Sequence, residues 1–156
     1  KSFGINKTIG DLAGPMAFAI LMGSSRAFYG KFGDKINLER FMQYSAVLCM
    51  VSYLMIAFIP VPALGILGCA VCGLSVGIMW PGTFSMAAAS VKRGGTALFA
   101  LLALAGDVGC SSGPTYVGMI SGALNDNLKL GIFAALIFPV LMIMGIKMIG
   151  SLRKYD

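Results

Sequence analysis

No charged residue occurs at positions 41–91, a stretch long enough for two membrane-spanning helices. Charges are sparse in the rest of the chain as well, because only 12% of its 156 residues are charged and 58% are hydrophobic. Soluble domains average roughly 25% charged residues. A soluble protein of this length would need a far more polar surface, so the sequence predicts an all-α bundle of transmembrane helices.

Apolar runs and helix-breaking residues divide the chain into five predicted spans. Pro60 and Pro62 form a turn too short for a soluble domain, so the helices on either side of it should run antiparallel. Arg26 falls near the end of the first span, where its long side chain can reach the membrane interface. The spans are expected at residues 12–29, 41–59, 63–89, 96–124 and 130–149.

A charged segment, residues 26–40, is expected to form a loop between the first two spans. An excess of Lys and Arg in a short loop marks the cytoplasmic side of a membrane. With this loop inside, nine cations fall on the inside, namely Arg26, Lys31, Lys35, Arg40, Lys92, Arg93, Lys147, Arg153 and Lys154. Three fall outside, namely Lys1, Lys7 and Lys129. The sequence therefore predicts an integral protein of the cytoplasmic or plasma membrane, with its N-terminus outside and its C-terminus in the cytoplasm.

The composition argues against several functions. The net charge is +6, but the cations border apolar runs and form no basic stripe with aromatic residues, so nucleic acid is not an expected partner. There is no histidine and no phosphate-binding Gly-x-x-x-x-Gly-Lys-Ser/Thr loop. Cys69 and Cys72 have the spacing of a redox or metal site, but the sequence has no second cysteine pair of this spacing. The cysteines are interpreted as small packing residues. We expect no enzyme, no metal and no other cofactor.

Asp107 is the one acidic residue deep within a predicted span, since the other carboxylates are assigned to loops or tails. A carboxylate at a helix centre costs at least about 2.5 kcal/mol unless it faces a cavity or a partner, so Asp107 is a candidate for proton or substrate binding. Ser111, Pro114 and Gly118 follow at helical spacing and are expected to line an aqueous path with it. The alternative is a hydrogen bond between tightly packed helices.

The third span contains a second candidate region, in which Pro81 predicts a tilt or kink. Trp80 is expected on the same helical face as Gly73 and Gly77, whose spacing allows another helix to pack closely. Amphipathic rings stack well on sugar or cationic surfaces, so Trp80 and Thr83 are candidate wall residues of a binding site. A place in the aromatic belt at the membrane interface is the alternative for Trp80.

Three segments resemble, in order, parts of the major facilitator superfamily of transporters. Gly30-Lys-Phe-Gly-Asp34-Lys35 resembles the Gly-x-x-x-Asp-Arg/Lys loop between helices two and three, and again eight and nine. Gly77-Ile-Met-Trp80-Pro81-Gly-Thr83-Phe84-Ser85 is similar to the Pro-x-x-Phe-Ser segment of helix ten in fucose-permease-like sugar transporters. Gly109-Cys-Ser-Ser-Gly113-Pro114 is similar to a segment of helix eleven. The loop departs from the family pattern where Asn37 replaces a usual Gly and Leu38-Glu39 replaces a second basic residue.

The resemblance implies that this chain supplies helices eight to twelve of a twelve-helix fold, with helix seven and the N-terminal half preceding Lys1. Two halves would rock around a central site for a small polar solute such as a sugar, driven by a gradient of protons or another ion. Such a fragment would not be expected to transport without the other half. A small channel, or a membrane assembly subunit that does not transport, is the alternative.

The resemblance also implies roles for individual residues. Asp34 would help to hold a cytoplasmic gate closed, and the alternative is a solvated loop charge. The other residues of this gating loop are Gly30, Lys35 and Arg40. Kinks and helix packing would be set by Pro81, Gly109, Gly113 and Pro114.

Overall fold

A computed structural model of the chain describes residues 7–59, 61–91 and 94–152, apart from the side chains of residues 7–11, 34, 62 and 152. Of these residues 90% are helical and none is in a strand, which confirms the all-α prediction. The elements are α1 (Lys7–Phe32), a short 3₁₀ helix η1 (Gly33–Lys35), α2 (Leu38–Phe58), α3 (Pro62–Val76), α4 (Met79–Ser90), α5 (Gly95–Ala123), α6 (Leu128–Ala134) and α7 (Ile137–Leu152).

Four helical stretches are long and apolar enough to cross a membrane, and two of them run through the short breaks between α3 and α4 and between α6 and α7. They are Leu38–Phe58, Ala63–Ser90, Gly95–Ala123 and Leu128–Ser151. They match the last four predicted spans to within a few residues and identify a membrane protein. The predicted span at residues 12–29 lies within α1, which is not among the four. Polar residues in its second half, Ser24, Ser25 and Arg26, lower its hydropathy.

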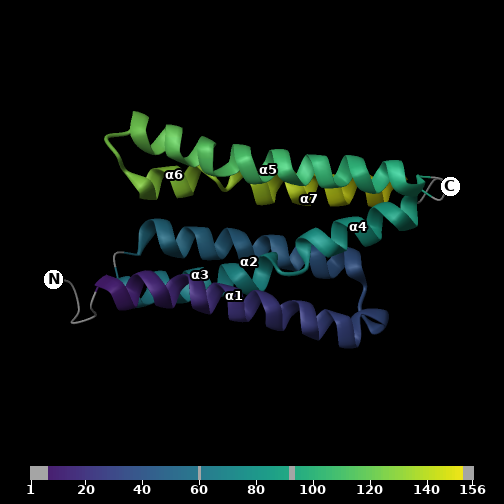
Figure 1. The fold of residues 1–156 in the computed structure, drawn as a ribbon, viewed down its shortest axis with the longest axis horizontal. Helices are drawn as coiled ribbons and strands as arrows, with labels where there is room; N and C mark the ends of the chain where they lie inside the picture. Colours follow the sequence, from purple (N-terminus) through teal and green to yellow (C-terminus); the bar gives the residue numbers. More distant parts are fainter. Residues whose placement is uncertain (1–6, 60, 92–93, 153–156) are drawn as a thin grey trace.

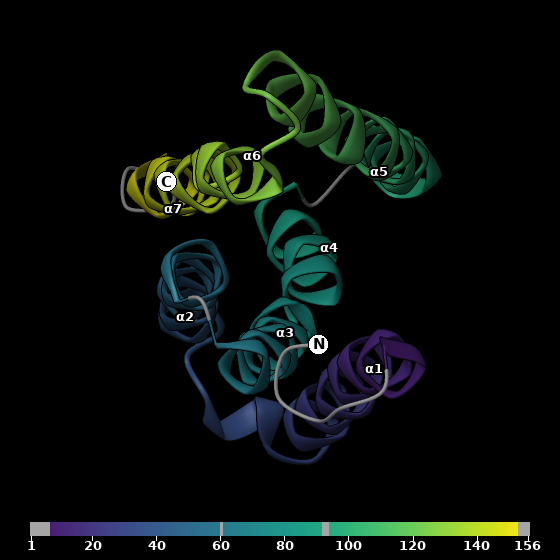
Figure 2. The same cartoon turned by 90° about the vertical axis from the view of Figure 1, so that its left-hand side faces the viewer.

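The helices form two groups, which meet where α2 packs against α6 and α7. Helices α1, α2 and α3 lie together on one side, α5, α6 and α7 lie together on the other, and α4 runs between the groups (Figures 1 and 2). Helices α2 and α3 run antiparallel, as the two-proline turn predicts. The α1–α2 connection lies at one end of the bundle, and the α2–α3 and α5–α6 connections lie at the opposite end (Figure 1).

Small residues bring α1, α2 and α3 close together. A side chain added at Gly73 would collide with the α1 backbone at Phe18, and one at Gly77 would lie 2.8 Å from the carbonyl oxygen of Met22. The predicted close packing of another helix on these glycines is therefore confirmed, and that helix is α1. The interior residues exposed by 2% or less are Met42, Ala46, Cys49, Ser52, Ser75 and Ile78.

The break between α3 and α4 follows from Pro81. Proline has no N–H to donate to the carbonyl four residues earlier, which here belongs to Gly77. The Arg26 side chain of α1 takes this place, because its Nε donates to the Gly77 oxygen at 3.0 Å. The expected interruption is confirmed, but it falls at residues 77–78, one turn before Pro81. The Arg26 side chain is also exposed, so its expected reach to the membrane interface stays a prediction.

The connection between α1 and α2 is much shorter than the predicted loop at residues 26–40. Helix α1 continues to Phe32, with Lys31 in its last turn, where a cation is favoured by the helix dipole. Helix α2 begins after Asn37, whose Oδ1 accepts a hydrogen bond from the Arg40 N–H at 3.2 Å. Gly30 therefore lies in a helix, and Arg40 lies in the first turn of α2.

Candidate functional site

Asp107 lies on an exposed face of α5 whose surface is mainly apolar. It lines a hollow of about 620 Å³ whose other lining residues all belong to the same helix, namely Val108, Ser111, Ser112, Thr115, Tyr116 and Met119. The most apolar part of α5 contains no buried residue. The structure therefore places the two predicted residues Asp107 and Ser111 together, on a surface that no other described helix covers.

Two hydroxyl groups on this face bond to the helix backbone. Ser111 Oγ donates to the Asp107 carbonyl oxygen at 2.9 Å, and Thr115 Oγ1 donates to the Ser111 carbonyl oxygen at 2.8 Å. Their donors are thus satisfied within α5, as membrane helices require, while their lone pairs can still accept a hydrogen bond. Together with the Asp107 carboxylate, they give a face suited to accepting protons or hydrogen bonds from a bound group.

Pro114 and Gly118 are exposed on the same continuous helix, seven and eleven residues after Asp107, and the aqueous path expected along this face stays a prediction. The hollow itself is lined by Thr115 and Tyr116 and not by Pro114 or Gly118. Thr115 could have been found from the sequence, because it continues the four-residue spacing from Asp107 through Ser111. Tyr116 packs edge-on against Phe138 of α7, with ring centroids 5.7 Å apart, so its position depends on a contact that the sequence does not specify.

Trp80 lies beside α5 but does not line the Asp107 hollow. Its ring packs against Phe84 at 4.4 Å, and Phe84 stacks on Phe99 of α5 at 5.8 Å. Its Nε1 lies 3.1 Å from the position that a Cβ atom would take at Gly106 of α5. The prediction that Trp80 shares a face with Gly73 and Gly77 is wrong, because the break at residues 77–78 changes the helical phase and turns Trp80 away from α1.

Thr83 is also separate from the hollow. Its Oγ1 donates to the Met79 carbonyl oxygen at 2.7 Å, inside the first turn of α4, and its side chain is half-buried. The four predicted binding residues thus fall into two pairs, with Asp107 and Ser111 on α5 and Trp80 and Thr83 on α4.

The residues predicted to shape helix eleven lie in a continuous helix. Helix α5 runs through Pro114 without a break. Among the described residues, nothing lies within 4 Å of a side chain built at Gly109 or Gly113. The close packing predicted for these glycines has no partner in the part of the chain that the structure describes.

Of the predicted gating residues, Gly30 lies in α1, Lys35 is exposed in η1 and Arg40 is exposed in α2. The side chain of Asp34 lies outside the described residues. A gating role for the four residues therefore remains a prediction.

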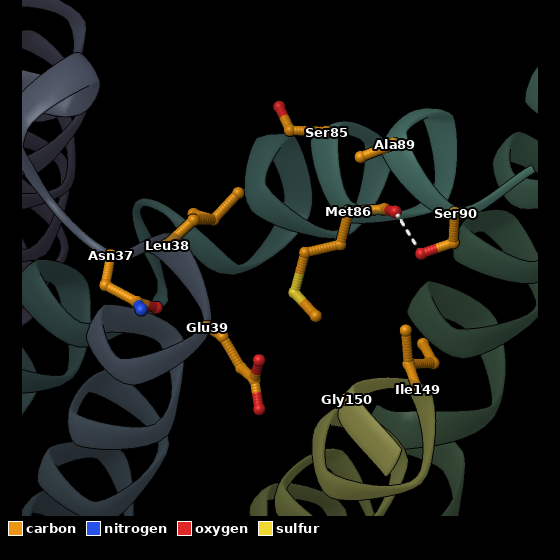
Figure 3. Close-up of a pocket in the computed structure, with 9 residues that line it drawn as sticks. All are labelled: Asn37, Leu38, Glu39, Ser85, Met86, Ala89, Ser90, Ile149 and Gly150. Carbon is orange, nitrogen blue, oxygen red and sulfur yellow. Dashed lines mark hydrogen bonds between the residues drawn. The ribbon is translucent and has the colours of Figure 1, made fainter. Parts of the chain in front are cut away.

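A second hollow, of about 490 Å³, lies between α2, α4 and α7 (Figure 3). Glu39 points into it, opposite Ile149 and Gly150, and a side chain added at Gly150 would collide with the Glu39 carboxylate. The assignment of Glu39 to a loop is therefore wrong. It lies in the first turn of α2, where a carboxylate is favoured by the helix dipole, and only the approach of α7 encloses it.

The described residues contain no group of three or more His, Cys, Asp or Glu side chains that could hold a metal ion. Cys49 and Cys72 are buried between α2 and α3, whereas Cys110 is exposed on α5. In comparisons with known proteins, no family model, curated protein or solved structure matches this chain.

Proposed function

We propose that the chain is part of a secondary active transporter for a small polar solute, built like helices eight to twelve of the major facilitator superfamily. In this proposal a complementary N-terminal half faces the exposed side of α5, and the solute path runs between the halves. The fifth span at residues 12–29 and the orientation with the N-terminus outside belong to the same proposal.

The observation that supports this function most strongly is the exposure of Asp107. A carboxylate in the middle of a membrane-spanning helix that faced lipid would cost about 2.5 to 3.5 kcal/mol. Asp107 has Ser111 and Thr115 beside it on one face, and no other described helix covers that face. A water-filled path would remove the cost and would give the three polar groups a ligand.

In the proposed mechanism Asp107 binds the coupling proton, and the lone pairs of Ser111 and Thr115 accept hydrogen bonds from solute hydroxyl groups. Trp80 and Thr83 contribute the adjoining wall on α4, with the indole ring offering a stacking surface to a sugar such as the family resemblance suggests. The segment with Asp34 and Lys35 would close the cytoplasmic side as the halves rock.

The test is solute uptake by the full-length protein in proteoliposomes, with and without an imposed proton gradient. Replacing Asp107 by Asn should abolish accumulation driven by the gradient and leave downhill exchange intact. Asp126→Asn is the matched control, because Asp126 lies in the α5–α6 turn with φ +57°, a conformation that Asn also adopts. Unchanged accumulation in Asp107→Asn would return Asp107 to a packing role.

The exposed apolar side chains of α5 favour one alternative, a membrane assembly subunit or small channel. Leu101, Leu104 and Val108 are each about 60% exposed, as expected for a helix that packs on a partner chain. A wild-type protein that takes up no tested solute, but conducts ions or purifies in a stable complex, would support this alternative over the transporter.

A further inference from the structure

A third hollow lies between α1 and α2. We call it the α1–α2 groove, and it has a volume of about 500 Å³, within the range of roughly 300 to 1,000 Å³ that is usual for ligand sites. Its lining comes from three helices, with Ser24, Ser25 and Phe28 on α1, Phe41, Tyr44, Ser45 and Leu48 on α2, and Leu74 on α3.

The groove has an apolar lining and an aromatic rim. Ser25 and Ser45 are only 5% and 6% exposed, so they contribute little polar surface. The Ser24 hydroxyl is tied to the Ile20 carbonyl oxygen at 2.8 Å. Phe28 and Tyr44 are 49% and 71% exposed and stand at the surface. Such a surface suits a flexible hydrocarbon chain.

Positive charges gather at the end of the groove where α1 passes into α2. Lys31 follows Phe28 by three residues and therefore extends the same face of α1. Arg40 directly precedes Phe41, and Lys35 lies in η1 between the helices. All three side chains are exposed. The rings of Tyr29 and Phe41 stack 5.9 Å apart and hold the two helices together at this end.

The nearby carboxylates leave this positive charge in excess. Segment 26–40 contains four cations against Asp34 and Glu39. Glu39 points into the hollow between α2, α4 and α7 (Figure 3), on the side of α2 opposite Phe41 and Tyr44. The end of the groove thus combines an apolar channel with an excess of cations, which is the arrangement that attracts anionic lipid headgroups beside a membrane helix.

We propose that the α1–α2 groove binds an anionic phospholipid. One acyl chain lies in the groove against Phe28, Leu48 and Leu74, and the phosphate is held by Lys31, Lys35 and Arg40. Tyr44 stands at the rim, where its amphipathic ring suits the headgroup level. This proposal rests on the membrane setting and does not depend on the transport function.

The test is lipid binding to the purified protein in a neutral detergent, measured by native mass spectrometry with phosphatidylglycerol or phosphatidylcholine of identical acyl chains. Phosphatidylglycerol should bind more tightly. The double variant Lys31→Gln/Arg40→Gln should lose this preference, by about five-fold for each cation. The control is Lys129→Gln, compared with the single variant Lys31→Gln; Lys129 is an exposed cation next to the α5–α6 turn, at the end of the bundle opposite to the α1–α2 connection, and its loss should leave the preference unchanged. Leu48→Trp, which fills the groove, should weaken the binding of both lipids.

Several results would overturn the proposal. Equal affinity for the two lipids would show that the cations do not select the headgroup, and an equal loss in the control variant would show that only net charge matters. Unchanged binding in Leu48→Trp would place the lipid elsewhere. Free glycerol phosphate that competes as well as the intact lipid would show that the groove contributes nothing.

Discussion

Helices α3 and α5 carry the same glycine spacing in opposite surroundings. Gly73 in α3 and Gly77 at its C-terminal end lie four residues apart and press directly against the α1 backbone. Gly109 and Gly113 in α5 have the same spacing, but a side chain at either position would meet nothing within 4 Å in the described part of the chain. The spacing allows close approach without supplying a partner, so the pattern alone does not identify a contact.

The two helices also differ in how they meet their neighbours. The stretch Ala63–Ser90 has 39% of its apolar window buried, whereas the window of Gly95–Ala123 has none. Contacts of α3 run through backbone and small side chains, while α5 reaches α4 through the rings of Phe84 and Phe99. Helix α3 therefore finds its packing partners within this chain, whereas α5 leaves most of its surface open to solute, water or another helix.

The largest expected contrast is in cysteine labelling, because Cys72 directly precedes Gly73 and Cys110 directly follows Gly109. Cys72 and Cys49 are buried, Cys69 is partly exposed, and Cys110 is exposed. In a Cys69→Ser variant, a charged methanethiosulfonate reagent in proteoliposomes should modify Cys110 and leave Cys49 and Cys72 unmodified. The reagent reacts in water, so modification would show that water reaches this face of α5. Labelling of Cys110 by an apolar maleimide alone would mean that the face is covered by lipid, contrary to the proposed path.

Replacing a glycine should lower the stability of the protein much more in α3 than in α5. Gly73→Leu forces a side chain into the α1 backbone at Phe18 and should destabilise the protein by about 3 kcal/mol, the upper end for overpacking. Gly109→Leu meets open space and should change stability by less than about 0.5 kcal/mol. Unfolding by denaturant in mixed micelles measures both. Equal losses would mean that α5 is packed as tightly as α3 in the protein.

Much of the fold could be predicted because it depends on the chain locally. An uncharged run leaves few alternatives to membrane helices, and two prolines close together force a tight turn. The spacing of Asp107 and Ser111 placed both on one face of α5 because that helix is continuous. Where helical phase is unbroken, counting residues is enough to group side chains.

The remaining errors arise where a distant segment decides the local structure. Trp80 was placed on the wrong face because the phase of α3 is lost at residues 77–78, where Arg26 from α1 takes the free carbonyl. The charged segment at 26–40 was read as a loop, although a cation in the last turn of α1 favours helix continuation. Glu39 became a cavity residue only because α7 approaches it.

A smaller effect on stability is expected from the hydrogen bond between Arg26 of α1 and the Gly77 carbonyl oxygen. Arg26→Met keeps the apolar stem but removes the donor to the Gly77 oxygen, and should cost about 1 kcal/mol. Pro81→Ala restores an N–H that can reach the same carbonyl, so Arg26→Met should cost almost nothing in that background. The two mutations should therefore couple in a double-mutant cycle of unfolding free energies. Strictly additive losses would show that the Arg26 bond does not replace the one that Pro81 lacks.

The smallest effect is expected where α5 meets α4. Phe99→Leu keeps an apolar side chain but removes the ring that stacks on Phe84, and should cost about 0.5 to 1 kcal/mol. Trp80 is the only tryptophan, so its fluorescence reports this contact directly and should shift when Phe84 loses its partner. Leu101→Ala is the control, since Leu101 is 65% exposed on the same helix and should leave the emission unchanged. An unchanged emission in Phe99→Leu would mean that the aromatic contact does not hold α5 beside Trp80. The proposal that Trp80 and Thr83 on α4 form a wall next to Asp107 and Ser111 on α5 would then lose its support.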